Sequence, residues 1–411
     1  MMKFTSGISD SVQIQKAITE ACEQVREQLA GARCDLACVF VSPIYRTRWT
    51  EALELLHDKL APAVFIGCSG SGVIGGGREF ESVPALSLVA AHLPEVRLYP
   101  FAVSPEELEQ SSPGGFWVDK IGVLADAQPI FVLLVDPYTC EPSKLLSELN
   151  ATFPKRPIIG GLVSGGNEPG EHLLFSDTEI LQAGAVGLAM TGNITMETII
   201  SQGCRPIGRP VIITKAEDNI VWELGGRQAL EVLREILVHL SPADQELAQH
   251  SIFVGLVIDE MKPAFQPGDF LIRPLVGIDP PSGAIAVAEE VQVGQTLQFH
   301  LRDPGASREE LRRLLAERRP LFHTTPPAGA LLFNCLGRGK AFYRVPHHDV
   351  KTIHTFSSNL PVGGFFCNGE IGPVGGRNLL HGYTASLGLF RPSTSSGRNP
   401  ESIEGFRPSV R

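Results

Sequence analysis

The chain has 411 residues, of which 43% are hydrophobic and 19% charged, a composition typical of globular proteins with a sizeable core. Its formal net charge of −10 argues against a nucleic-acid partner, because such proteins concentrate positive charge to neutralise phosphates. A chain of this length predicts two domains rather than one.

The N-terminus and the cysteines predict a cytoplasmic protein. The chain shows no signal-peptide pattern, and no apolar run reaches the length of about eighteen residues that a membrane span needs. The eight cysteines are scattered without a C-x2-C pair, which predicts reduced thiols and no structural zinc site. We therefore expect neither a membrane partner nor a bound metal.

The first half of the chain alternates short buried strands with amphipathic helices. A helix is predicted over residues 9–29, followed by a strand over 36–41, a helix over 48–60 and a strand over 63–67. The glycine-rich segment 67–81 comes next. Further elements are expected at residues 85–91, 96–101, 104–108, 130–135, 141–149, 157–161, 183–190 and 194–200.

The pattern restarts after the Gly- and Pro-rich segment 203–210, which indicates a boundary. Elements in the second half are expected at residues 226–240, 252–258, 270–278, 284–288, 296–301, 308–319, 329–333, 349–356 and 383–390. Adjacent strand pairs mixed with strand–helix alternation predict an α+β (mixed α/β) fold, with two lobes of mixed β-sheets flanked by helices. The Ser-, Gly-, Pro- and Arg-rich tail, residues 392–411, is expected to be disordered.

Glycines recur in a fixed frame at distant points of the chain. The frame reads Gly67, Gly72, Gly75 in one copy, Gly364, Gly369, Gly372 in another, and Gly160, Gly165 in a partial third. Glycine permits positive φ and close backbone approach, and turns at strand ends expose N–H groups that bind anions. The frame therefore indicates either tight strand packing or a set of ligand-binding loops.

Several long motifs around these glycines resemble a known family. IGCSGSGVIGGGREFE resembles the signature of the FIST N domain, and PIIGGLVSGG fits the middle of that domain. FNCLGRGKAFY, GGFFCNGEIGPVGG and LLHGYTASLGLF resemble successive FIST C signatures. The resemblance implies a FIST N-type domain over residues 31–207 and a FIST C-type domain over 208–391, and the predicted N-terminal helix, residues 1–30, lies outside the match.

The resemblance also implies a function. FIST modules are intracellular signal-transduction modules proposed to sense small ligands such as amino acids. Neither flank of the matched region is long enough for an effector domain, so we expect output through a separate signalling partner. The ligand is expected between the two lobes, at the loops around residues 67–79, 334–339 and 364–376.

An amino acid needs N–H donors for its carboxylate and a carboxylate for its ammonium group. Arg338, between two glycines after a strand, is the candidate for the first role, and Glu370 for the second. Glu370 could instead pair with Arg338 and brace two loops. Asn334 and Cys335 could add hydrogen bonds.

Other candidates lie at strand ends, where open sheets place ligand groups. Asp136 ends a buried strand, although it could simply cap the following turn, and Arg78 follows the first glycine frame. The remaining expected ligand-binding residues are Cys68, Ser69, Gly70, Ser71, Gly72, Gly339 and Gly364.

Three alternatives remain open from the sequence. Cys68 before Ser69-Gly70 could be the nucleophile of a hydrolase, but no His is near it in sequence, so no catalytic constellation is predicted. Some FIST-type proteins bind haem to detect nitric oxide, and His381 is the best-placed ligand for that cofactor; otherwise no cofactor is expected. The third alternative is a protein-interaction scaffold.

Overall fold

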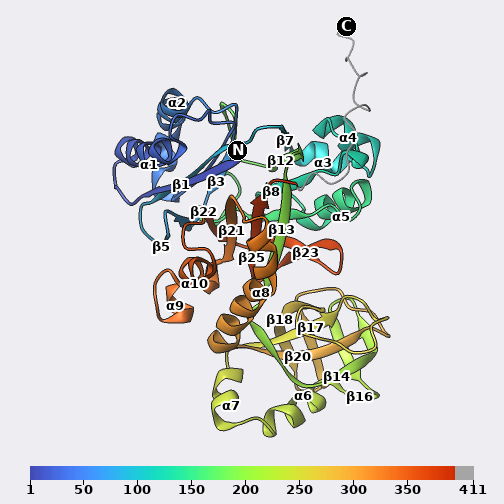
Figure 1. The fold of residues 1–411 in the computed structure, drawn as a ribbon. Coiled ribbons are helices and arrows are strands. Elements are labelled where there is room, and N and C mark those ends of the chain that lie inside the picture. Colours follow the sequence, from blue (N-terminus) through green and yellow to red (C-terminus); the bar gives the residue numbers. More distant parts are fainter. Residues whose placement is uncertain (394–411) are drawn as a thin grey trace.

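The computed structural model describes residues 1–393, and the tail predicted to be disordered lies, from residue 394 on, outside the described residues. Within residues 1–393 the strands form three six-stranded sheets and one seven-stranded barrel sheet. Figure 1 shows the three sheets packed together in the upper lobe and the barrel as a separate lower lobe. The predicted α+β class with mixed sheets is confirmed.

The upper lobe contains three units of the same topology. In each unit a parallel strand pair lies at the centre of a sheet, with two antiparallel strands on one side. The first unit runs β1 (Lys3–Ser9), α1 (Ile14–Leu29), β2 (Leu36–Val41), α2 (Trp49–Leu60), β3 (Val64–Ser69), the hairpin β4 (Gly72–Gly75) and β5 (Arg78–Glu81), and β6 (Leu86–His92).

The second and third units repeat this order. The second comprises β7 (Val96–Val103), α3 (Pro105–Gln110), α4 (Gly115–Ile121), β8 (Ile130–Val135), α5 (Pro142–Thr152), β9 (Ile158–Leu162), β10 (Leu174–Ser176), β11 (Glu179–Leu181) and β12 (Ala185–Gly192). The third comprises β13 (Thr195–Ser201), α8 (Pro304–Thr324), β21 (Gly329–Cys335), α9 (Lys340–Tyr343), α10 (His348–Phe356), β22 (Val362–Cys367), β23 (Glu370–Val374), β24 (Arg377–His381) and β25 (Ala385–Arg391).

The hairpin of each unit completes the sheet of another unit. The β4–β5 hairpin pairs with β22 of the third unit, β10–β11 pairs with β3 of the first, and β23–β24 pairs with β9 of the second. The three sheet orders are therefore identical: β1-β6-β2-β3-β10-β11, β7-β12-β8-β9-β23-β24 and β13-β25-β21-β22-β4-β5. This cyclic exchange gives the upper lobe an approximate threefold symmetry.

The barrel is an insertion between β13 and α8 of the third unit. It closes because β14 pairs with both β20 and β15. Its helices α6 and α7 lie at one end, and α6 adds Leu230 and Leu233 to the barrel core. Its elements are β14 (Cys204–Glu217), β15 (Ile220–Leu224), β16 (Arg227–Gln228), α6 (Ala229–Val238), α7 (Pro242–Ala248), β17 (Ile252–Val257), β18 (Phe270–Asp279), β19 (Ala284–Val287) and β20 (Thr296–Arg302).

The central core lies where the inner faces of the three sheets meet. Phe40, Leu134 and Phe333 occupy equivalent strand positions in the three units and belong to one buried cluster. Helices cover the outer faces, so the central strands are buried on both sides. Burial on both faces explains why these strands read in the sequence as continuous apolar runs such as IFVLLV.

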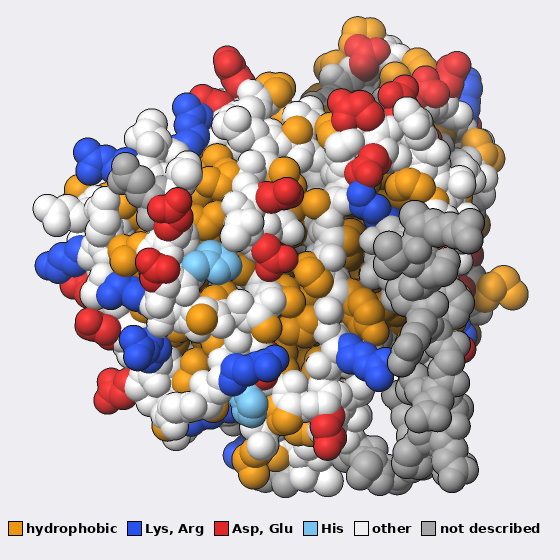
Figure 2. All heavy atoms as spheres, turned by 90° about the horizontal axis from the view of Figure 1, so that it is seen from above, with side chains coloured by type: hydrophobic (Ala, Val, Ile, Leu, Met, Phe, Trp, Pro, Cys, Tyr) orange, Lys and Arg blue, Asp and Glu red, His pale blue; other side chains and the backbone are white. Residues whose placement is uncertain are grey.

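Charged side chains are spread over the outside. Figure 2 shows Lys and Arg interspersed with Asp and Glu on the upper face. Among the described residues, no helix is both long and apolar enough to cross a membrane.

Candidate functional site

A pocket of about 490 Å³ lies where the three units of the upper lobe meet. Most of its wall is built from loops that follow the parallel strands, and Ser82 follows β5. The lining residues are Ser42, Pro43, Ile44, Ser71 and Ser82 of the first unit, Tyr138, Ser164, Gly165, Gly166 and Asn167 of the second, and Leu336 and Asn368 of the third. We call this space the central pocket. Its lining includes residues from all three loop regions that the sequence predicted to form the ligand site, namely Ser71, Leu336 and Asn368.

The strand registers show that the three loop sets are equivalent. Three glycines face the preceding parallel strand at corresponding points: Gly67 opposite Val39, Gly160 opposite Leu133 and Gly364 opposite Leu332. Counting onward from these glycines in the sequence brings Ser71, Ser164 and Asn368 to one equivalent position, and all three line the central pocket. One polar side chain from each unit therefore surrounds the same space.

Hydrogen bonds join the loops across the unit boundaries. The Ser71 amide donates to Ser164 Oγ at 2.9 Å, and that hydroxyl donates to the Phe366 carbonyl. The Asn368 amide donates to the Leu162 carbonyl at 3.0 Å. These contacts hold segments about 90 to 200 residues apart in register around the pocket.

The glycine frame serves packing at its first position in every copy. An added Cβ would lie 2.2 Å from the Val39 carbonyl oxygen at Gly67 and 1.8 Å from the corresponding oxygens at Gly160 and Gly364. Gly72 is equally restricted, by Phe366 and by the backbone of Phe80. Gly364 and Gly72 are thus required by close strand contact rather than by a ligand.

The predicted residues Cys68, Ser69 and Gly70 lie inside the fold behind the pocket. Burial raises the pKa of the Cys68 thiol well above its ordinary value, the reverse of what a nucleophilic cysteine needs. Ser69 is buried and its Oγ accepts the Leu173 amide at 3.1 Å. Gly70 packs against the Phe365 ring. The hydrolase alternative therefore has no exposed thiol at Cys68.

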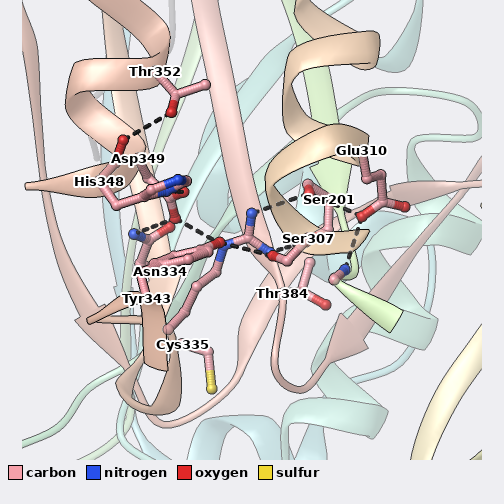
Figure 3. Close-up of polar contacts among 12 residues, drawn as sticks. Ser201, Ser307, Glu310, Asn334, Cys335, Tyr343, His348, Asp349, Thr352 and Thr384 are labelled. Atoms are coloured by element: carbon pink, nitrogen blue, oxygen red, sulfur yellow. Dashed lines mark hydrogen bonds and ion pairs between the residues drawn. The ribbon is translucent and has the colours of Figure 1, made fainter. Parts of the chain in front are cut away.

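Arg338 is buried and is not among the residues that line the central pocket. It belongs to the polar network around Ser201, Asn334 and Asp349, which Figure 3 shows. Its Nε donates to Asp349 Oδ2 at 2.8 Å, and its Nη1 and Nη2 donate to the carbonyl and hydroxyl of Ser201 at 2.8 and 3.1 Å. Asn334 is also buried and donates to Asp349 at 3.1 Å. The interpretation of Arg338 as the carboxylate binder was wrong, because its guanidinium is used within the fold.

Ser201 and α8 connect this network to the barrel. Ser201 is the last residue of β13, directly before the inserted barrel, and its hydroxyl donates to Glu310 of α8, directly after it. The Gly203 amide donates to the same carboxylate at 2.8 Å. The network therefore fixes both chain connections between the two lobes.

Glu370 is fully buried and does not pair with Arg338 through a hydrogen bond or a salt bridge. Its Oε2 accepts the Thr384 amide at 3.0 Å, and burial raises its pKa well above the ordinary value. Burial also raises the pKa of Cys335 to about 12. Neither Glu370 nor Cys335 lines the central pocket.

Two further predicted residues lie on the outside of the third sheet. Arg78 is exposed, with its guanidinium 5.1 Å from the centre of the Phe80 ring. Gly339 packs against Glu81, whose carboxylate accepts the Lys340 amide at 2.8 Å at the start of α9. Neither Arg78 nor Gly339 lines the central pocket.

His381 does not fit the role of a haem ligand. It is buried within β24, and its Nε2 lies 3.0 Å from the Gly372 carbonyl. Burial lowers its pKa to about 4, and it lines neither of the two pockets described among residues 1–393. The haem alternative therefore has no open axial position at His381.

Asp136 is a predicted site residue that lies beside the central pocket. Its side chain has a partner, His172, that the sequence did not reveal. It is fully buried at the end of β8, and its Oδ1 lies 3.2 Å from His172 Nδ1. His172 is 36 residues away and follows no recognisable spacing, so only the fold brings the two together. The predicted turn cap is also present, since the Tyr138 amide donates to the same oxygen at 2.9 Å.

Glu79 on β5 gives a pH-dependent prediction. Burial and the charge of Asp349, with Glu81 also near, raise the pKa of Glu79 from 4.5 to about 8. Between these values the native state holds a proton that the unfolded chain releases, so stability decreases as pH rises through this window. Glu79→Gln keeps the acceptor for the Val350 amide. Urea unfolding at about pH 5 and at about pH 8 measures the stability that the protein loses between these two pH values, and this loss should be smaller in the variant than in the wild type. Equal losses in the two proteins would contradict the shifted pKa of Glu79.

A second pocket, of about 510 Å³, lies at the junction of the first and second units. Arg33, Asp35 and His92 on its wall already bind one another, with Asp35 accepting from Arg33 at 2.7 Å and contacting His92 at 2.9 Å. Its lining includes no residue of the glycine-frame loops. It serves below as the comparison pocket.

Comparison with known proteins identifies the family to which the chain belongs. The FIST N domain model matches residues 35–227 and the FIST C domain model matches residues 229–373, so the chain belongs to the family of proteins with FIST N and FIST C domains. FIST domains are associated with sensory roles in signal transduction. The two models meet within the barrel region, directly after β16.

The chain is similar over nearly its whole length to mycobacterial proteins described as uncharacterised. One from Mycobacterium tuberculosis H37Rv is 38% identical over 393 residues, covering 95% of this chain and 100% of the relative. One from Mycobacterium bovis is 37% identical over 390 residues, covering 95% of this chain and 99% of the relative.

Proposed function

We propose that this protein is a sensory signal-transduction protein that binds a small metabolite, such as an amino acid, in the central pocket. The observation that carries the proposal is the composition of the pocket wall, which takes loops from all three units. A ligand in the central pocket contacts segments far apart in the chain, so its binding energy stabilises one arrangement of the three units over others.

The residues that line the pocket also favour a small polar ligand. Ser71, Ser164, Asn167 and Asn368 supply hydroxyl and amide groups, which form directional hydrogen bonds. The signal passes, in this proposal, to a separate effector protein. Free thiols at all eight cysteines support a cytoplasmic location.

Ligand binding is testable by thermal shift. The wild-type protein should be stabilised by at least one member of a panel of the twenty amino acids and related metabolites, because a ligand at a hundred times its Kd contributes about 2.7 kcal/mol. Leu336→Trp enlarges a partly exposed residue of the pocket wall and should abolish the shift.

The matched control is Leu98→Trp, which enlarges a half-buried residue of the comparison pocket. It should keep the ligand-induced shift of the wild type. A shift that survives Leu336→Trp and is lost in Leu98→Trp would move the ligand to the comparison pocket and contradict the proposal.

A further inference from the structure

The threefold symmetry of the pocket is broken by charge in the second unit. The residue that follows the first parallel strand is Ser42 in the first unit and Asp136 in the second, and the equivalent residue of the third is Cys335. The amides of all three donate to equivalent carbonyls, at 2.9, 2.9 and 3.0 Å, so the backbones are equivalent while the side chains differ. The second unit is thus the one that places a carboxylate at this position.

The Asp136–His172 pair contains two buried polar atoms that lack a hydrogen-bond partner among the described residues. Asp136 Oδ2 and His172 Nε2 are buried, and neither has a hydrogen-bond partner within the described part of the chain. Burial raises the pKa of Asp136, but the hydrogen bonds from His172, the Tyr138 amide and the Thr139 side chain outweigh it and hold the pKa below its ordinary value. The carboxylate is therefore ionised, and His172 Nδ1 lies within hydrogen-bond distance of it, at 3.2 Å.

This pair lies immediately behind the pocket wall. The Tyr138 ring stacks on the His172 ring at 5.4 Å between centroids, and Tyr138 lines the pocket. Gly166 also lines the pocket, and a Cβ built on it would lie 3.1 Å from His172 Nε2. Gly166 therefore lies beside the His172 ring as well as on the pocket wall.

We infer that Asp136 and His172 form the polar anchor of the central pocket and select a ligand with a cationic primary amino group. The buried negative charge of Asp136, with its Oδ2 atom lacking a hydrogen-bond partner within residues 1–393, favours a positively charged donor, which an ammonium group supplies. No residue that lines the pocket carries a positive charge, so a ligand carboxylate would have no ionic partner there. A small amine should therefore bind better than the corresponding acid. This inference rests on the proposed function and specifies the ligand class of the same pocket.

The test compares three probes with one two-carbon skeleton: ethanolamine, ethylene glycol and glycolate. Binding to the full-length protein is followed by NMR titration. Ethanolamine should bind at least about tenfold more tightly than the other two, which corresponds to about 1.4 kcal/mol. Asp136→Asn keeps the shape and the acceptor for the Tyr138 amide but removes the charge, and it should abolish this preference. Cys335→Ser, at the equivalent position of the third unit and outside the central pocket lining, should keep it.

The outcomes separate this inference from the proposed function. Tighter binding of glycolate, or an ethanolamine preference that survives Asp136→Asn, would overturn the anchor. Binding of other metabolites that Leu336→Trp abolishes, with no binding of ethanolamine, would also overturn the anchor while the sensory function stands. Should Asp136→Asn not fold, the ring nitrogens of His172 in the wild-type protein provide the readout: ethanolamine must shift the Nε2 resonance, and an unchanged resonance refutes the contact.

Discussion

Arg338→Ala is expected to destabilise the protein by about 3–5 kcal/mol, because it leaves Asp349 as a buried charge without its ionic partner. Both side chains of the pair are fully buried, and the guanidinium also holds the carbonyl and hydroxyl of Ser201. Burial by itself would lower the pKa of Arg338, but the charge of Asp349 raises it above its ordinary value. Equilibrium urea unfolding measures the loss.

The matched control for this variant is Arg313→Ala on α8. Arg313 pairs with Glu317 one helical turn away, and both side chains are 45% exposed. Exposed pairs of this kind contribute roughly 0.3–0.5 kcal/mol, so the control should be nearly as stable as the wild type. A double variant, Arg338→Met with Asp349→Leu, should recover part of the loss because it removes both charges. Equal stabilities of Arg338→Ala and Arg313→Ala would contradict a structural role for the buried pair.

Most elements of the upper lobe could be predicted from the sequence. The strands over 36–41 and 130–135 were predicted at the observed bounds, because they are continuous apolar runs bounded by turn residues. The capped helix near Ser104 is confirmed as α3, which begins with a capping box. The predicted helix over 9–29 was too long at its start, since β1 occupies Lys3–Ser9 and α1 begins at Ile14.

The exchange of hairpins could not be predicted, because strand pairing depends on contacts between distant segments. Gly364 pairs with Ile74 across almost 300 residues, and no local pattern encodes that choice of partner. The same limit applies to the site. The sequence predicted a ligand between the two lobes at three loops. Residues of all three loops line the central pocket, but this pocket lies within the upper lobe. The sequence also could not show that Arg338 turns inward to Asp349 or that His172 reaches Asp136. Residue type predicted the chemistry of these side chains, and only the fold determines their partners.

Gly364→Ala is expected to destabilise the upper lobe by more than about 3 kcal/mol, above the usual cost of overpacking a core. An alanine Cβ would lie 1.8 Å from the Leu332 carbonyl oxygen, and the backbone φ of +152° is one that residues with side chains rarely adopt. To avoid this steric clash, β21 and β22 would have to separate, and these two strands form the centre of their sheet. Gly160→Ala should cost a similar amount, because its φ is +155° and its Cβ would lie 1.8 Å from the Leu133 oxygen.

Gly115→Ala is the control, because a Cβ on Gly115, the first residue of α4, would have no neighbour within 4 Å. Alanine is a better helix former than glycine, so this variant should be unchanged or more stable by up to about 1 kcal/mol. The comparison also separates the two interpretations of the glycine frame. Glycines that existed to admit a ligand would, when replaced, weaken ligand binding at unchanged stability. If Gly364→Ala unfolds at the same urea concentration as Gly115→Ala, close strand packing is not the reason for the frame, and the interpretation given above fails.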